Sequence, residues 1–247
     1  MLTYTYVSKG TFALMEKPKP VLQHERDAIV KVTLASICSS DLHIKHGSVP
    51  RAVPGITVGH EMVGIVEEVG SAVTNVKPGD RVTVEELLYG LLLCSGNDAA
   101  LALADHCGGL ERFVAEMNRK AAELGMTGTS FANPNGLDQE GHYSTARDMA
   151  RLAACAVKNE TLVRLCSTRS VTVGGRTMTN HNRLLRSIDG CIGLKTGYTR
   201  AAGRTLVSCV RRNGRTLVAV TLQDGNDWAD HAALYDYGFS TYPAKLG

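Results

Sequence analysis

Three residues in the first third of the chain have side chains that could bind a metal ion. Cys38 lies in Ile-Cys-Ser-Ser-Asp-Leu-His, and His60 and Glu61 lie in Gly-His-Glu-Met-Val-Gly. Thiolate, imidazole and carboxylate groups are all zinc ligands, and a catalytic zinc keeps one position open for water or substrate. Taken one at a time, such residues are more often buried structural groups, so the metal hypothesis depends on the pattern around them.

That pattern is specific. The order C-x-S-D-L-H, then G-H-E-x-x-G-x-V-x-x-V-G, then V-x-x-G-D-R-V resembles the zinc-dependent, medium-chain alcohol dehydrogenases over residues 1–84. The resemblance implies a GroES-like catalytic domain in which Cys38, His60 and Glu61 bind zinc. It also implies that Ser40 relays the proton of the alcohol and that His43 is a polar residue beside it.

The dehydrogenase pattern then stops. The cysteine-rich lobe, the later zinc ligand and the nucleotide domain of that family do not follow, and no Gly-x-Gly-x-x-Gly motif occurs after a strand. We therefore expect no NAD site and no hydride transfer. We expect at most a weak zinc site, because an incomplete ligand set and an incomplete outer shell both lower the affinity for the metal.

Two further motifs lie one hundred residues apart. Ser95-Gly96-Asn97 and Lys195-Thr196-Gly197 are each common by chance and would separately be interpreted as turns. Together they correspond to the S-x-N and K-T-G elements of serine-active penicillin-binding enzymes. Their surroundings include E-E-L-L-Y-G-L-L-L-C before Ser95, N-P-N-G-L-D from Asn133, and G-H-Y-S-T-A-R-D-M-A from Gly141. Residues 85–247 thus resemble the low-molecular-mass D-alanyl-D-alanine carboxypeptidases of bacterial walls.

The substrate of that family ends in a D-alanine carboxylate. Lys195 and Thr196 can neutralise and hydrogen-bond such a group, and Gly197 would let the substrate backbone approach the strand. The resemblance implies that Ser95 belongs to the proton-shuttling network and that Asn97 holds the substrate amide. It further implies one half of an oxyanion hole at the backbone N–H of residue 198, which is Tyr198.

The family's nucleophile is missing. In the family an S-x-x-K motif lies roughly 55 to 65 residues before S-x-N, and its lysine activates its serine. No lysine of this chain has a serine three residues before it, and the nearest analogue is Thr74-x-x-Lys77. The sequence therefore predicts a constellation that positions a substrate and does not attack it.

The elements that position these residues change in kind near Val84. Before it, short β-type runs separated by Gly and Pro turns predict strands at 28–34, 62–69 and 81–84. After it, apolar periodicity predicts helices at 84–94, 98–107, 110–124, 145–158 and 227–239, with strands at 170–173, 192–196, 204–211 and 216–222. Gly125 is a predicted helix cap, and Asn213-Gly214 is a predicted hairpin turn.

The fold class is therefore α+β. We predict a truncated β-barrel-like, GroES-like piece at 1–84, followed at 85–247 by an incomplete penicillin-binding or β-lactamase-like domain of helices and an antiparallel sheet. The two patterns overlap at Val82-Thr83-Val84 with no Gly, Ser or Pro linker, which indicates a chimera of two truncated parts.

Composition narrows the partners. The net charge of +3 and the scattered basic residues argue against nucleic acid, and no apolar run reaches the roughly 20 residues of a membrane span. The N-terminal residues show no signal peptide, and seven cysteines without a C-x-x-C pair suit a reducing compartment. The expected location is therefore cytoplasmic, although the carboxypeptidase family is normally exported.

The sequence thus predicts a D-alanyl-D-alanine carboxypeptidase by lineage that has lost its activity. The expected ligands are a peptidoglycan stem peptide or a β-lactam, both held weakly. Two alternatives stay open: a zinc-binding fragment of an alcohol dehydrogenase, and a non-catalytic chimeric protein.

Overall fold

The computed structural model describes residues 1–36, 39–59, 61–73, 77–79 and 82–242. The chain forms two compact units. One comprises Met1–Thr83 together with Asn97–Ala102, and the other comprises Val84–Gly96 and Leu103–Gly247. The first boundary falls between Thr83 and Val84, next to the position where the sequence pattern changes.

The strands of the first unit pair in two separate antiparallel sheets. Strand β1 (Leu2–Ser8) pairs with β2 (Thr11–Glu16), and β3 (Ala28–Ser36) pairs with β4 (Glu61–Val69). Helix α1 (Ser39–Lys45) follows β3. Within the described residues these strands form two-stranded sheets, so the expectation of a barrel-like piece is not met by the strand pairing. The closing contacts of a barrel need further strands on both edges of each sheet.

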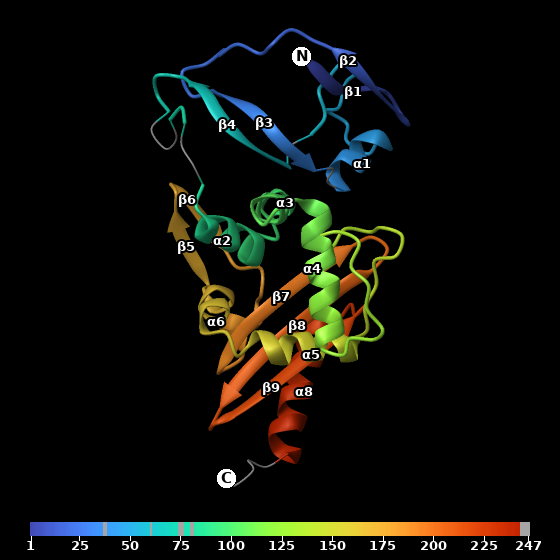
Figure 1. The fold of residues 1–247 in the computed structure, drawn as a ribbon, viewed down its shortest axis with the longest axis vertical. Coiled ribbons are helices and arrows are strands. Elements are labelled where there is room, and N and C mark those ends of the chain that lie inside the picture. The colour runs from blue at the N-terminus through green and yellow to red at the C-terminus, as the bar shows by residue number, and fades with distance from the viewer. Residues whose placement is uncertain (37–38, 60, 74–76, 80–81, 243–247) are drawn as a thin grey trace. The chain divides into compact units, whose positions relative to one another are not determined.

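The second unit contains most of the helices and a three-stranded antiparallel sheet (Figure 1). Its helices are α2 (Val84–Cys94), α4 (Leu110–Glu123), α5 (Ala146–Ala156), α6 (Glu160–Ser167), α7 (Leu184–Ser187) and α8 (Asp227–Thr241). Helix α3 (Asn97–His106) has residues in both units. The strands of the second unit are β5 (Ser170–Val173), β6 (Arg176–Thr179), β7 (Cys191–Thr199), β8 (Gly203–Arg212) and β9 (Arg215–Leu222).

The sheet has the order β7-β8-β9, so β7 is an edge strand among the described residues. Strands β8 and β9 are joined by the predicted hairpin turn: Asn213 has φ 49° and Gly214 has φ 72°. Two successive residues with positive φ match the twist of a two-residue hairpin, and Asn and Gly adopt that conformation most readily. Helix α6 packs against β7, and α5 and α8 pack against β9.

The core of this unit joins the sheet to its helices. One cluster of buried side chains is formed by residues of α5 and its C-cap, α6, β7 and β8, namely Ala153, Val157, Val163, Cys166, Leu194 and Cys209. A second cluster joins Tyr89 and Leu93 of α2 to Leu165 of α6. Burying one large apolar side chain stabilises a fold by roughly 1.5–3 kcal/mol, so these clusters hold α2 and β7 in place.

Helix α4 ends where the sequence predicted. Gly125 has φ 68°, and the N–H of Met126 donates to the carbonyl of Ala121 at 2.9 Å. A residue with positive φ, followed by a residue whose N–H donates to the carbonyl five positions earlier, forms a Schellman cap. Such a cap satisfies carbonyls at the end of a helix. The Met126 side chain is buried immediately after the cap, so the chain is turned back toward the core.

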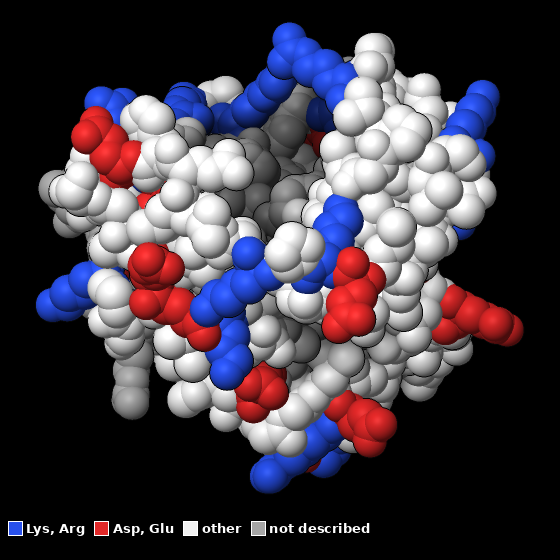
Figure 2. Space-filling view, turned by 90° about the horizontal axis from the view of Figure 1, so that it is seen from above, with Lys and Arg blue, Asp and Glu red and all other residues white. Residues whose placement is uncertain are grey.

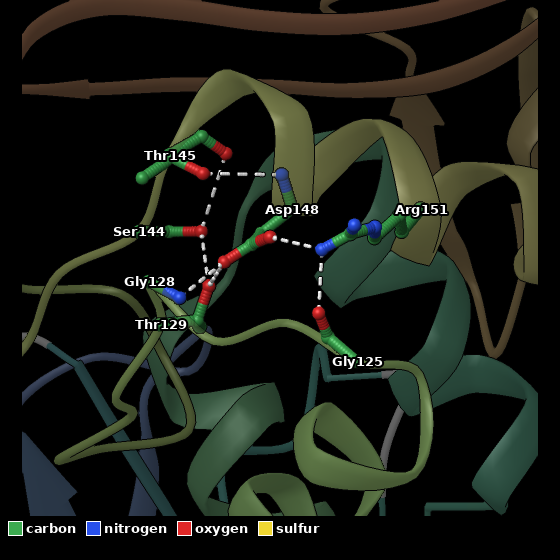
Figure 3. Close-up of polar contacts among 7 residues, drawn as sticks. All are labelled: Gly125, Gly128, Thr129, Ser144, Thr145, Asp148 and Arg151. Atoms are coloured by element: carbon green, nitrogen blue, oxygen red, sulfur yellow. Dashed lines mark hydrogen bonds and ion pairs between the residues drawn. The ribbon is translucent and has the colours of Figure 1, made fainter.

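The motif G-H-Y-S-T-A-R-D-M-A begins α5 and fastens it to the segment after α4 (Figure 3). Thr145 caps the helix by accepting a hydrogen bond from the N–H of Asp148. The buried Asp148 carboxylate accepts from the N–H of Gly128 at 2.8 Å, from the Thr129 hydroxyl at 2.9 Å and from Arg151 at 3.1 Å. A Cβ at residue 128 would lie 2.9 Å from the Thr145 methyl group, which explains the glycine there.

One expectation about the elements was wrong, and several elements were not predicted. The predicted strand at 81–84 is absent from its described part, since Val84 already belongs to α2. The elements that the sequence did not predict are each no longer than eight residues, namely β1, β2, α1, α6, β6 and α7. Short elements depend on tertiary packing more than on local preference, because a few residues carry little periodic signal.

No helix within the described ranges combines the length and the apolar character that crossing a bilayer requires. On the face drawn in Figure 2, Lys and Arg side chains alternate with Asp and Glu side chains. This mixture agrees with the small net charge of the sequence.

Candidate active site

The Ser95 hydroxyl and the Lys195 ammonium meet at the end of α2 and the edge strand β7. Ser95 follows the last residue of α2 and has φ 57°, a left-handed conformation that is uncommon for a residue with a side chain. The turn directs an exposed hydroxyl toward β7. Lys195 Nζ donates to Ser95 Oγ, and it donates a second hydrogen bond to the carbonyl oxygen of Thr196 at 2.7 Å.

Burial sets the protonation of this pair. Removal from water lowers the pKa of Lys195 to about 8, and the nearby Cys166 and Cys94 thiols oppose that shift. Burial raises the pKa of Cys166 to about 11, so this thiol is neutral near pH 7. Because a buried ammonium loses hydration that a neutral thiol does not replace, Lys195 can change its protonation state in the ordinary pH range.

A hollow of about 590 Å³ lies beside the pair within the second unit. Its lining comes from the residue after α2, from α7 and the segment before it, from β7 and β8, and from the start of α8. The lining residues are Ser95, Asn180, His181, Arg183, Arg186, Thr196, Gly197, Tyr198, Arg204, Thr205, Asp227 and Trp228. Four of these residues carry cationic or imidazole side chains. The hollow therefore suits a ligand that carries negative charge.

One arginine of the hollow is neutralised and held in place. The Arg204 guanidinium donates two hydrogen bonds to the buried Asp227 carboxylate, one of them at 3.1 Å from Nε. Its Cζ atom lies 5.5 Å from the centre of the Trp228 ring, and that of Arg183 lies 5.9 Å from the same ring. The exposed His181, Arg183 and Arg186 carry the remaining basic character of this wall.

Gly197 is required by its neighbour on β8. Gly197 pairs with Thr205, and a Cβ at residue 197 would stand 2.5 Å from the Thr205 hydroxyl oxygen. The resemblance to the carboxypeptidases predicts that this glycine lets a substrate backbone approach the strand. The contact with Thr205 supplies a structural reason that is independent of any ligand.

The far end of β7 is tied to the N-P-N-G-L-D segment. Thr199 donates a hydrogen bond to the Asp138 carboxylate at 2.7 Å. Asn133 organises the loop itself, because its amide donates to the carbonyl of Leu137 at 2.9 Å and its oxygen accepts from the N–H of Gly136 at 2.7 Å. The loop is thus fixed beside Tyr198, whose side chain is 73% exposed.

The structure brings together some of the predicted site residues. The predicted proximity of Ser95 and Lys195 is confirmed by their hydrogen bond, and Thr196, Gly197 and Tyr198 line the hollow next to them. Asn97 is the first residue of α3 and groups with the first unit, so its role toward a substrate stays a prediction.

The described part of the chain does not test the predicted zinc residues. Cys38 and His60 lie outside the described residues, and of Glu61 and Ser40 only the backbone is described, in β4 and α1. His43 is exposed on α1. The zinc hypothesis therefore stays a prediction.

Several residues of the hollow could not be predicted from the sequence, among them Arg183 and Trp228, which are more than forty residues apart. The contact of Asp138 with β7 was not predicted either, because Asp138 belongs to a separate loop. The N-P-N-G-L-D motif was a signal that its loop mattered. Only the folded chain shows which strand the loop contacts.

Helices packed on an antiparallel sheet, with a serine–lysine pair at the edge strand, define the class of penicillin-binding DD-peptidases. A family model for D-alanyl-D-alanine carboxypeptidase matches residues 46–226. The chain belongs to the D-alanyl-D-alanine carboxypeptidase family. The predicted resemblance of the C-terminal part is therefore confirmed. The match begins at residue 46, inside the stretch that is predicted to be dehydrogenase-like.

Individual relatives agree. D-alanyl-D-alanine carboxypeptidase DacF of Bacillus subtilis is 38% identical over 177 residues, covering 67% of this chain and 45% of that protein. DacB2 of Mycobacterium tuberculosis is 41% identical over 185 residues, covering 70% of this chain and 64% of that protein. The crystal structure of the Streptomyces K15 DD-transpeptidase superposes with a TM-score of 0.63 at 36% identity, covering 67% of this chain and 71% of the other. This chain thus spans about half to two thirds of the length of these curated relatives.

Proposed function

We propose that the second unit binds the D-alanyl-D-alanine end of a wall peptide, or a β-lactam, and does not hydrolyse it. The observation that carries the proposal is the hydrogen-bonded pair of Ser95, after α2, and Lys195, on β7, beside a hollow with a basic wall. The terminal carboxylate would accept hydrogen bonds from Lys195 and Thr196. The exposed Arg183 and Arg186 would add long-range attraction.

The lack of hydrolysis follows from the missing S-x-x-K motif. Acyl transfer in this family runs through an ester on the serine of that motif, which its lysine activates. Loss of a nucleophile from such a constellation typically lowers the rate about a millionfold and leaves the contribution of binding. A carboxylate bound to Lys195 also favours the ammonium form, which cannot take a proton from Ser95.

A fluorescent penicillin followed by denaturing electrophoresis tests this proposal. We expect no labelled band, because the ligand is held without a covalent bond. A band that survives denaturation and disappears on competition with unlabelled penicillin would contradict the proposal. Variants Ser95→Ala and Thr74→Ala would then identify the residue that carries the label.

For residues 1–84 we propose a dehydrogenase-like fragment without a nucleotide site, joined to the carboxypeptidase part near Val84. The C-x-S-D-L-H and G-H-E patterns support this assignment, and the unit boundary after Thr83 agrees with it. The family match from residue 46 assigns part of this stretch differently. Sequencing reads that cross codons 80–90 in the source genome test whether the junction exists in the DNA. Reads that break within this window would show that the junction was made in assembly.

A further inference from the structure

We propose that Ser95 and Lys195 form a nucleophile–base pair that accepts acyl groups from uncharged, activated esters. This activity goes beyond peptide binding and gives Ser95 a role other than proton shuttling. The two side chains are joined directly by a hydrogen bond, and Ser95 is exposed at the hollow of about 590 Å³. A base in contact with an accessible hydroxyl is the arrangement that activates serine in covalent catalysis.

The local backbone supports a nucleophilic role for Ser95. The residue has φ 57°, immediately after the last turn of α2, and the following N–H of Gly96 donates to the carbonyl of Gly90 at 3.1 Å. Residues with side chains are rare in the left-handed region and gather at functional sites, where the surrounding structure maintains the strain. A sharp turn at the end of an element also exposes the nucleophile of other hydrolases.

Lys195 is held as a base would need to be. Its Nζ atom donates to the carbonyl of Thr196 at 2.7 Å, which fixes the amine relative to the Ser95 hydroxyl. The titratable groups that face it are the thiols of Cys166 on α6 and Cys94 on α2. Since burial lowers the pKa of Lys195 to about 8, a substantial fraction of the amine is neutral in mildly alkaline solution and can accept a proton.

The proposed step balances. Ser95 Oγ attacks the ester carbonyl carbon, and the hydroxyl proton passes to the neutral Nζ of Lys195. The tetrahedral intermediate collapses, the bond to the leaving alkoxide breaks, and the leaving group departs as a stable aryl oxide or takes the proton back from Lys195. The products are an ester on Ser95 and the released alcohol, and attack by water on that ester regenerates the serine.

The pair discriminates between ligands by charge. A ligand with a carboxylate at Lys195 keeps the amine protonated, so Ser95 is not deprotonated while that ligand is bound. An uncharged ester leaves the amine free to act as a base. The ester reaction and peptide binding therefore use the same lysine in opposite protonation states.

The test uses para-nitrophenyl acetate with the full chain, follows release of para-nitrophenolate, and locates the acetyl group by mass spectrometry of peptides. We expect acetyl on Ser95 and a rate that rises with pH about a midpoint near 8. Ser95→Ala and Lys195→Arg should each lower the rate by about 100-fold, because a positioned general base contributes roughly 10²–10⁴-fold. Arginine keeps the positive charge and cannot act as a base at this pH.

The matched control is Ser240→Ala, which removes an exposed hydroxyl that donates only to the carbonyls of Asp236 and Tyr237. It should react like the unchanged chain. Acetyl located on Cys94 or on surface lysines alone, or an unchanged rate in folded Lys195→Arg, would overturn the proposal. Fluorescence of Trp228 reports whether each variant is folded, and the acetyl position in the unchanged chain decides the question if Ser95→Ala does not fold.

A second arm separates this inference from the proposed function. An N-acetylated peptide that ends in D-alanyl-D-alanine should slow acetylation of Ser95, whereas the same peptide with a C-terminal amide should not. Acetylation of Ser95 without protection by the free acid would leave the nucleophile–base pair standing and would contradict peptide binding at Lys195.

Discussion

Replacement of Ser208 by alanine should destabilise the second unit by about 2–4 kcal/mol. Ser208 lies on β8 and is fully buried. Its hydroxyl lies 2.6 Å from Nδ1 of His231 and 2.6 Å from the hydroxyl of Tyr235, both on α8. The other ring nitrogen of His231 lies 3.1 Å from the Thr221 hydroxyl. This chain of hydrogen bonds joins α8 to the sheet through the buried side chains of Ser208, His231 and Tyr235 and the half-buried Thr221.

The magnitude follows from which groups lose a partner. Ser208→Ala leaves Nδ1 of His231 buried without its hydrogen bond, and an unsatisfied buried polar group costs about 1–3 kcal/mol. The Tyr235 hydroxyl loses one bond but keeps a backbone interaction at Ala219, for a further cost of about 0.5–1.5 kcal/mol. Tyr235→Phe removes the bond to Ser208 and the interaction at Ala219 but leaves the bond between Ser208 and His231, so it should cost about 1–2 kcal/mol.

Urea unfolding followed by tryptophan fluorescence measures these values. Trp228 is the single tryptophan of the chain and lies in the first turn of α8, so its signal reports on this part of the molecule. Ser187→Ala, at an exposed serine, is the control. The reasoning would be refuted if Ser208→Ala changed the free energy of unfolding by less than Tyr235→Phe, or by no more than the control.

Lowering the pH from 7 to 5 should reduce the free energy of unfolding. Burial lowers the pKa of His231, although nearby carboxylates oppose the shift, so below about pH 6.5 the unfolded chain binds a proton that the folded chain does not. Urea titrations followed by Trp228 fluorescence measure this loss, which should disappear in His231→Gln. Asp148→Ala should lower the melting temperature by about 5 °C, because the N–H of Gly128 loses its acceptor, and a scan showing no change would contradict the role of the carboxylate. Added zinc should bind at one equivalent or less and be removed by a mild chelator, with binding abolished in Cys38→Ala; equal zinc content in that variant, measured by elemental analysis, would reject the site.

The elements of the second unit were largely predictable because their signals are local. Gly125 caps α4, and Asn213-Gly214 forms the turn between β8 and β9. In both cases the residue type itself favours the positive φ that the cap or turn requires. Apolar periodicity located α2 and α8 to within two residues of their observed ends. The described residues 82–84 of the strand predicted at 81–84 do not form a strand, because they lead into a helix whose buried Tyr89 and Leu93 fix the local structure.

The motif residues of the site could be predicted from the sequence, but the other residues that line the hollow could not. Ser95 and Lys195 could be paired from the family pattern, although one hundred residues separate them. No sequence motif contains Arg204, Asp227 or Trp228. These residues come into contact only because the start of α8 packs beside β8. The lowered pKa of Lys195 also depends on tertiary burial, which no local pattern specifies.

The most direct measurement is equilibrium dialysis of the full chain against an N-acetylated peptide that ends in D-alanyl-D-alanine, with mass spectrometry of the peptide on both sides of the membrane. It reports binding and cleavage in one experiment. We predict that the peptide is retained by the protein, that it stays intact, and that retention is lost in Lys195→Met and with the C-terminal amide of the peptide. Release of D-alanine in excess over the protein, or equal retention of the acid and the amide, would contradict the account.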